Sequence, residues 1–127
     1  MGDAAHIARN FWERMNTNDW ALAARLFAPD FELLWPQSNE RISSSEDFVA
    51  LNAAYPADGK WSFSVCRLIG DGQQAMTETE ITDGKVEAVA LTLFEVENAM
   101  IRRIVEHWPE AYPAPEWRQR WVSPISQ

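Results

Sequence analysis

Two apolar strands joined by a very short loop are the feature that most restricts how this chain folds. Residues 86–96 and 101–108 are rich in apolar and β-branched side chains, which favours strands over helices. Between them, Glu97-Asn98-Ala99 fits a three-residue hairpin loop with Asn98 or Ala99 in the left-handed conformation. The pattern therefore predicts an antiparallel β-hairpin.

One face of this hairpin combines small residues, large aromatic residues and a single carboxylate. A three-residue loop places Ala90 directly opposite Glu106. Because small residues beside aromatic ones leave space, we expect this face to line a cavity rather than a filled core. The residues of the face are Ala88, Ala90, Thr92, Phe94, Ile104, Glu106 and Trp108.

Glu106 is the candidate catalytic residue, with Thr92 as a hydrogen-bond donor to a substrate oxygen. Desolvation on an apolar face raises the pKa of a carboxyl group toward the range that is useful for proton transfer. The alternative is a structural carboxylate bonded to a buried hydroxyl, a backbone amide or an arginine. A two-residue loop would turn the second strand over, so that Arg103, Val105 and His107 would face the cavity in place of Glu106.

Helical and strand patterns in the rest of the chain predict further elements that precede the hairpin. Asp83-Gly84 predicts a two-residue turn that places Thr77 opposite Ala90 and adds Ala75, Thr77 and Thr79 to the small-residue face. The expected elements are helices at 4–15 after Asp3 and at 20–27 after Asp19, with Pro29 as the stop, a strand at 31–35, a helix from the capping box Ser43-Ser44-Ser45-Glu46 to Pro56, and strands at 61–69 and 74–82.

Large apolar residues on these elements are expected to form the cavity walls, which would suit a ring-shaped or polyketide-like apolar ligand. The same residues also fit an ordinary hydrophobic core. The expected binding residues are Phe11, Met15, Phe31, Trp35, Thr77, Ala90, Phe94, Ile104 and Trp108.

Length and composition bound the remaining possibilities. A chain of 127 residues that is 46% hydrophobic predicts one globular domain, and the lack of a long apolar run predicts a cytoplasmic protein without a membrane span. A formal charge of −8 argues against nucleic acid and anionic membranes as partners. The single Cys66, expected to be a core or interface hydrophobe, and two histidines form no metal-ligand motif, so neither metal nor cofactor is expected. For Arg102, Arg103, Arg118 and Arg120, a solvated face or local ion pairs are favoured over a basic patch.

The outer face of the sheet and the C-terminal tail both indicate association. Val89, Leu91, Leu93 and Val105 would face outward and are too apolar to remain in water, which predicts a two-fold homodimer. Residues 109–127 contain four prolines, and a short helix is expected at 116–121. We expect this tail to wrap over the cavity mouth or over a partner subunit.

The order of two helices, a strand, a third helix and a long antiparallel sheet resembles the nuclear-transport-factor-2-like cone fold. Asn16-x-x-Asp19 and the run from Leu26 to Phe31 resemble the opening elements of that superfamily. Phe94-x-Val96-Glu97-Asn98, followed by Glu106-His107-Trp108, resembles the closing hairpin of SnoaL-like polyketide cyclases. The resemblance implies an α+β fold in which N-terminal helices pack on a strongly curved antiparallel or mixed sheet around a cavity, and it also implies a homodimer.

The resemblance to individual enzymes of this superfamily is incomplete. Phe11, Trp35 and Thr92 fall at or near positions where ketosteroid isomerases or SnoaL-type cyclases carry a catalytic tyrosine, a general base and a further acid. Glu106 aligns with a catalytic aspartate of limonene-epoxide-hydrolase-like members, without their arginine and aspartate partners. We therefore expect a cofactor-independent cyclase, isomerase or hydrolase that uses Glu106 as acid and base. The alternative is a non-catalytic ligand-binding or dimeric assembly domain.

Overall fold

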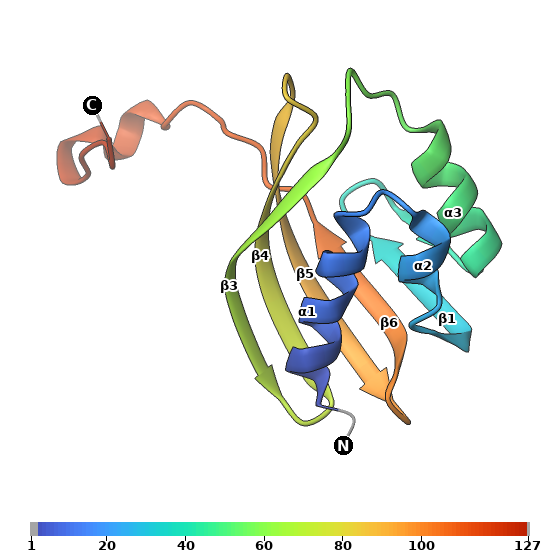
Figure 1. Ribbon diagram of the computed structural model, residues 1–127. Coiled ribbons are helices and arrows are strands. Elements are labelled where there is room, and N and C mark those ends of the chain that lie inside the picture. Colours follow the sequence, from blue (N-terminus) through green and yellow to red (C-terminus); the bar gives the residue numbers. More distant parts are fainter. Residues whose placement is uncertain (1–2, 127) are drawn as a thin grey trace.

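The computed structural model describes residues 3–126 and consists of a curved sheet of six strands with helices packed on one face (Figure 1). The strand order is β2-β1-β6-β5-β4-β3; β1 and β6 are parallel and all other neighbours are antiparallel. This mixed, open sheet confirms the predicted α+β fold with N-terminal helices. The elements are α1 (Ala4–Met15), α2 (Trp20–Ala24), β1 (Phe27–Trp35), β2 (Glu40–Ile42), α3 (Ser45–Ala54), β3 (Ser62–Asp71), β4 (Gln74–Thr82), β5 (Glu87–Glu97), β6 (Met100–His107) and the 3-10 helix η1 (Glu116–Trp121).

Each α-helix begins with a side chain that accepts a hydrogen bond from a free backbone N–H of its first turn. Asp3 accepts from Ala5 at 3.0 Å, and Asp19 accepts from Leu22 at 3.2 Å, as the sequence predicts. In α3 the capping residue is Ser44, which accepts from Asp47 at 3.0 Å, so the helix starts one residue later than the predicted capping box. Among residues 3–126, none of the helices has the length and hydrophobicity that crossing a bilayer requires.

The predicted extent of α2 is wrong, because sheet pairing ends the helix early. The N–H of Ile101 donates to the carbonyl of Leu26 at 2.8 Å, and Phe27 is already the first residue of β1. Pro29 therefore lies inside β1, in an irregular stretch between Phe27 and Glu32, instead of stopping a helix. Proline is tolerated there because an irregular stretch of strand does not require every backbone N–H. The short strand β2 was not predicted from the sequence.

The hairpin of β5 and β6 differs from its predicted register in two compensating ways. Glu97 pairs with Met100, so the loop has two residues, and Asn98 and Ala99 both adopt positive φ values of 53° and 63°. One extra residue, Arg102, then forms a bulge, because Glu95 pairs with Arg103 while Val96 pairs with Ile101. The short loop alone would turn Glu106 outward, and the bulge turns it back.

As a result, Glu106 lies on the predicted inner face but opposite Thr92 rather than Ala90. His107 lies opposite Leu91 and is exposed on the outer face, as the favoured prediction places it. A register argument from loop length alone cannot locate these residues, since one bulge reverses its outcome.

The connection between β4 and β5 is also longer than the predicted two-residue turn. Thr82 pairs with Glu87, which leaves four loop residues at 83–86. The Asp83 carboxylate holds this loop by accepting from the backbone N–H groups of Asp58, Lys85 and Val86, and these bonds lower the pKa of Asp83 to about 2. The pairing shifts by two residues, so Ala75, Thr77 and Thr79 stay on the buried face, with Thr79 opposite Ala90.

The core lies between α1, α3 and the inner face of the sheet, and aromatic rings dominate it. Phe11 of α1 packs edge-on against Phe94 of β5, and Phe48 of α3 packs edge-on against Phe27 of β1. Cys66 is not part of this core, because it lies exposed at a bulge in the edge strand β3. The prediction of a core cysteine is therefore wrong, and an interface role for it stays a prediction.

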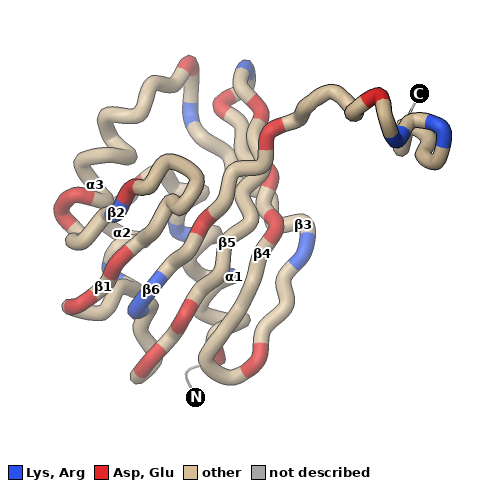
Figure 2. The backbone as a smooth tube through the Cα atoms, turned by 180° about the vertical axis from the view of Figure 1, so that it is seen from behind, with Lys and Arg blue, Asp and Glu red and all other residues tan. Residues whose placement is uncertain are grey.

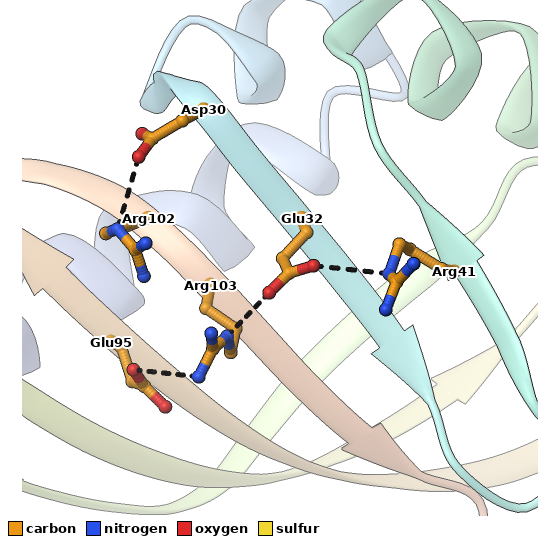
Figure 3. Close-up of polar contacts among 6 residues, drawn as sticks. All are labelled: Asp30, Glu32, Arg41, Glu95, Arg102 and Arg103. Carbon is orange, nitrogen blue, oxygen red and sulfur yellow. Dashed lines mark hydrogen bonds and ion pairs between the residues drawn. The ribbon is translucent and has the colours of Figure 1, made fainter.

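The outer face of the sheet carries a chain of ion pairs that crosses four strands (Figure 3). Glu32 of β1 bonds Arg41 of β2 at 3.2 Å and Arg103 of β6 at 2.9 Å, and Arg103 also reaches Glu95 of β5 at 3.6 Å. Arg102 pairs with Asp30 at 3.2 Å. The prediction of local ion pairs for Arg102 and Arg103 is thus confirmed.

The C-terminal tail leads away from the body of the fold (Figures 1 and 2). The predicted short helix is present as η1, and the side chains of Tyr112, Trp117 and Trp121 are largely exposed. The guanidinium groups of Arg118 and Arg120 lie 6.0 and 4.9 Å from the centres of the Trp117 and Trp121 rings. Contact of the tail with a partner subunit stays a prediction.

The left-handed conformation of Ala99 gives a direct test of the hairpin loop. A Cβ atom disfavours this conformation by about 1 kcal/mol, and glycine adopts it freely. Ala99→Gly is therefore expected to raise the free energy of unfolding by about 1 kcal/mol in a urea titration. Ala50→Gly, at an exposed position of α3, should lower it by about 1 kcal/mol. Destabilisation by Ala99→Gly would contradict the two-residue loop.

Candidate functional site

A pocket with a volume of about 150 Å³ lies between the helices and one end of the inner sheet face. Its walls come from α1, α2, α3 and strands β1, β3, β4, β5 and β6, together with residues of the loops that border them. The lining is mostly aromatic, and Glu106 supplies its one carboxyl group. The lining residues are Phe11, Trp12, Met15, Trp20, Leu33, Trp35, Phe48, Asn52, Tyr55, Trp61, Phe63, Ile81, Val86, Ala88, Glu106 and Trp108.

The Glu106 carboxyl group is held by one hydrogen bond to each of its oxygens. The indole Nε1 of Trp35 donates to Oε1 at 3.0 Å, and the hydroxyl of Thr92 donates to Oε2 at 2.8 Å. The side chain is 6% exposed, so these two donors replace most of its hydration. Each oxygen keeps a further lone pair with which it can accept from a ligand.

Three adjacent strands bring these side chains to the same level of the sheet. Leu34 of β1 pairs with Val105 of β6, so Trp35 occupies the next register position, beside Glu106. Thr92 of β5 lies directly opposite Glu106 from the other side. The contact therefore depends on both the parallel pairing of β1 with β6 and the bulge at Arg102.

Burial is the main influence on the pKa of the Glu106 carboxyl group. Desolvation raises the pKa of Glu106 above its ordinary value, while the hydrogen bonds from Trp35 and Thr92 act in the opposite direction and only partly offset it. Among the described residues that line the pocket there is no lysine, arginine or histidine, and Tyr55 is the other ionisable side chain. The arrangement provides one proton donor or acceptor at the inner wall of an apolar pocket.

The structure divides the predicted site residues into two groups. Those that line the pocket are Phe11, Met15, Trp35, Glu106 and Trp108. The others are buried in the core away from the pocket walls, and they are Phe31, Thr77, Ala90, Thr92, Phe94 and Ile104. Thr92 reaches the site only through its bond to Glu106.

Trp12 explains why the small residues of the sheet do not border free space. Its indole Nε1 donates to the hydroxyl of Thr77 at 3.0 Å, and its ring packs edge-on against Phe94 with the ring centres 6.4 Å apart. A large side chain of α1 thus packs against the small-residue face. The pocket lies further along the sheet, where Ala88 borders it.

Several lining residues were missed by sequence reasoning because they lie on helices, strands and loops where no residue pattern distinguishes a pocket wall from the core. An available signal was the seven tryptophans in 127 residues, since buried tryptophans and tyrosines gather where an apolar surface also needs a polar partner. The missed residues are Trp12, Trp20, Leu33, Phe48, Asn52, Tyr55, Trp61, Phe63, Ile81 and Val86.

The side chains that could ligate a metal ion are dispersed in the described part of the chain. Within residues 3–126, no three histidine, cysteine, aspartate or glutamate side chains gather where they would hold a metal ion. The polar side chains at the pocket are Glu106, with its donors Trp35 and Thr92, and Asn52 and Tyr55.

Comparisons with known proteins show which of them this chain resembles. A family model described as a SnoaL-like domain matches residues 8–118. The structure of a candidate ketosteroid isomerase from Kribbella flavida has 32% sequence identity and a TM-score of 0.85, with 96% of this chain and 89% of that chain covered. A protein of unknown function from Burkholderia xenovorans, described as NTF-2 like, has 25% identity and a TM-score of 0.77, with coverages of 95% and 94%.

More distant solved structures share the fold alone. An LEH-like epoxide hydrolase from Mycobacterium tuberculosis has 16% identity and a TM-score of 0.68, with 84% of this chain and 82% of that chain covered. A search of curated proteins found no match.

The raised pKa of Glu106 predicts how stability depends on pH. Between the ordinary carboxyl pKa of 4.5 and the higher pKa of the folded state, the folded chain binds a proton that the unfolded chain does not bind. The stability that the folded chain gains from binding this proton is therefore fully present below pH 4.5. It is lost as the pH rises through the pKa that Glu106 has in the folded chain. Glu106→Gln removes it, and its amide can still accept from Trp35 and donate to Thr92.

Urea titrations between about pH 4 and about pH 8 measure this difference. Relative to the wild type, Glu106→Gln should gain stability as the pH rises, whereas the control Glu13→Gln, at an exposed position of α1, should follow the wild type. If the free energies of unfolding of Glu106→Gln and the wild type changed with pH in parallel, the raised pKa of Glu106 would be contradicted.

Proposed function

Because this chain belongs to the SnoaL-like domain family, we propose that it is a cofactor-independent enzyme in which Glu106 transfers a proton to or from a small substrate. The family match covers most of the chain, and the family resemblance inferred from the sequence is confirmed by it. The reaction class is that of a cyclase, an isomerase or a hydrolase acting on an apolar substrate with one polar group.

The observation that carries this proposal is the position of Glu106. It is a buried carboxyl group with a raised pKa at the wall of the pocket, held at both oxygens so that its orientation is fixed. A general acid or base works best when its pKa lies near the operating pH and its geometry is preorganised. Both conditions favour Glu106 over any other described residue of the pocket.

Pocket size limits the substrate. An apolar cavity of about 150 Å³ accommodates a molecule of the size of benzene. A complete polyketide or steroid would exceed this volume, so we expect a single-ring substrate or the terminal ring of a larger one. The aromatic walls supply the apolar contact, and the polar group of the substrate would bond Glu106.

Glu106→Gln tests the catalytic role. In a panel of small cyclic enones, ketones and epoxides, any substrate that is turned over should lose about 10²–10⁴-fold in kcat, because removal of a general acid or base costs this much. Substrate affinity should stay nearly unchanged. Trp35→Phe removes one donor to the carboxylate and should move the pH profile of the remaining activity to higher pH. Full activity in Glu106→Gln would exclude Glu106 from the mechanism.

A non-catalytic binding domain is the second candidate, and one observation favours it. Both oxygens of Glu106 already accept hydrogen bonds from the protein, and the described pocket walls contain no second charged group to assist a reaction. This candidate predicts binding without turnover of any panel member. Ala88→Phe, which fills the pocket at its border, should abolish binding under both candidates.

We also propose that the outer sheet face forms a homodimer interface. Register pairs place five apolar residues side by side across five strands, and Ile69 and Met76 are 75% and 49% exposed. The ion pairs of Glu32, Arg103 and Glu95 border this row along one side. The row consists of Leu34, Val105, Leu93, Met76 and Ile69.

Leu93→Lys tests this interface, since a charge at the centre of the row would have to be desolvated on association. Light scattering after size exclusion should give twice the chain mass of 14.5 kDa for the wild type and a single chain mass for the variant. Glu13→Lys, on α1 at the opposite face, should leave the dimer intact. A monomeric wild type at about 0.1 mM would contradict the proposal, because stable dimers of this kind associate at lower concentrations.

A further inference from the structure

The pocket walls are unusually rich in aromatic rings. Nine of the sixteen lining residues are aromatic, and five of the seven tryptophans of the chain are among them. The rings contact one another around the pocket. Trp20 packs edge-on against Phe63, and the centre of the Phe63 ring lies 5.5 Å from that of Trp12. Tyr55 packs edge-on against Trp61. An ordinary apolar pocket is built as readily from leucine, isoleucine and valine, which here contribute only three lining residues.

Among the described residues, Glu106 is the one carboxyl group in these walls, and it has no cationic partner. The two neighbours of Glu106 are neutral donors, and the arginines of β6 and β2 form their ion pairs on the opposite face of the sheet (Figure 3). When Glu106 is ionised, its buried negative charge is compensated by two hydrogen bonds alone. A positive charge within the pocket would stabilise the ionised form.

We propose that the pocket binds a small organic cation, namely the tertiary or quaternary ammonium group of its ligand, with the aromatic walls around the cation and Glu106 as its counter-charge. This proposal rests on the same pocket as the proposed function and specifies the class of substrate. Aromatic faces attract ammonium groups through the ring quadrupole, most strongly for tryptophan, and a quaternary ammonium group needs no hydrogen-bond acceptor. The aromatic walls supply the ring faces that attract such a group, and Glu106 supplies a negative charge to pair with it.

The size of the pocket fits this class of ligand. A cavity that accommodates benzene also accommodates a trimethylammonium group with a short substituent. Choline has this structure, and 3,3-dimethylbutan-1-ol has nearly the same shape with a neutral carbon in place of the charged nitrogen. The two molecules therefore separate charge recognition from apolar burial.

Titration calorimetry with both probes tests the proposal at about pH 8, where a larger share of Glu106 is ionised than at lower pH. The wild type should bind choline at least about tenfold more tightly than 3,3-dimethylbutan-1-ol, as expected for a desolvated cation beside aromatic rings and a counter-charge. Glu106→Gln should reduce this preference to about threefold or less while leaving the affinity for the neutral probe unchanged.

Trp61→Leu provides a second variant that keeps Glu106 in place. It should weaken choline binding by about threefold relative to the neutral probe, because leucine retains apolar contact and loses the ring quadrupole. Trp117→Leu, in the exposed tail away from the pocket walls, is the matched control and should change neither affinity.

The outcomes separate this proposal from the proposed catalysis. Equal affinity for the two probes, binding of neither probe, or a choline preference that survives in Glu106→Gln would overturn the cation proposal. Turnover of neutral substrates together with equal affinity for the two probes would support the proposed catalysis and contradict the proposal of cation binding. A choline preference in a protein that turns over neither the panel nor trimethylammonium-bearing analogues of its members would support cation binding and contradict the proposed catalysis.

Discussion

The bulge at Arg102 is the constraint on which the rest of the site depends. The two-residue loop at Asn98 and Ala99 sets β5 and β6 in a pairing that would place Glu106 in solvent, and one unpaired residue reverses this. Because side chains alternate along a strand, no gradual adjustment could achieve the same result. The inner position of the carboxyl group, its bonds to Trp35 and Thr92 and the polarity of the pocket all follow from that single residue.

Glu106 in turn illustrates how neighbouring strands set the properties of an acid. Burial disfavours its charge, and the two donors from β1 and β5 limit that effect while they fix its orientation. The sequence resemblance places acids of ketosteroid isomerases and SnoaL-type cyclases near Trp35 and Thr92. In this chain, the same two positions supply hydrogen-bond donors to an acid on the final strand of the sheet, β6.

Much of the fold could be predicted from the sequence because local signals specify it. Asp3 and Asp19 cap helices, and alternation identifies the long strands, including β4 at its observed bounds. Strand registers and pocket position could not be predicted in the same way. A bulge at Arg102 leaves no signal in residue type, and only the packing of α1 shows that Trp12 covers the small residues near Thr77. Glu106 was predicted on the correct face because the loop length and the bulge compensated each other.

The parallel pairing of β1 with β6 also determines when the site can form. Trp35 and Glu106 are separated by 71 positions along the chain, whereas the hairpin partners Thr92 and Glu106 are separated by 14. Contacts between distant segments carry the larger cost in loop-closure entropy. During synthesis β1 is made well before β6, so Glu106 can acquire its indole partner only after the hairpin of β5 and β6 has been made.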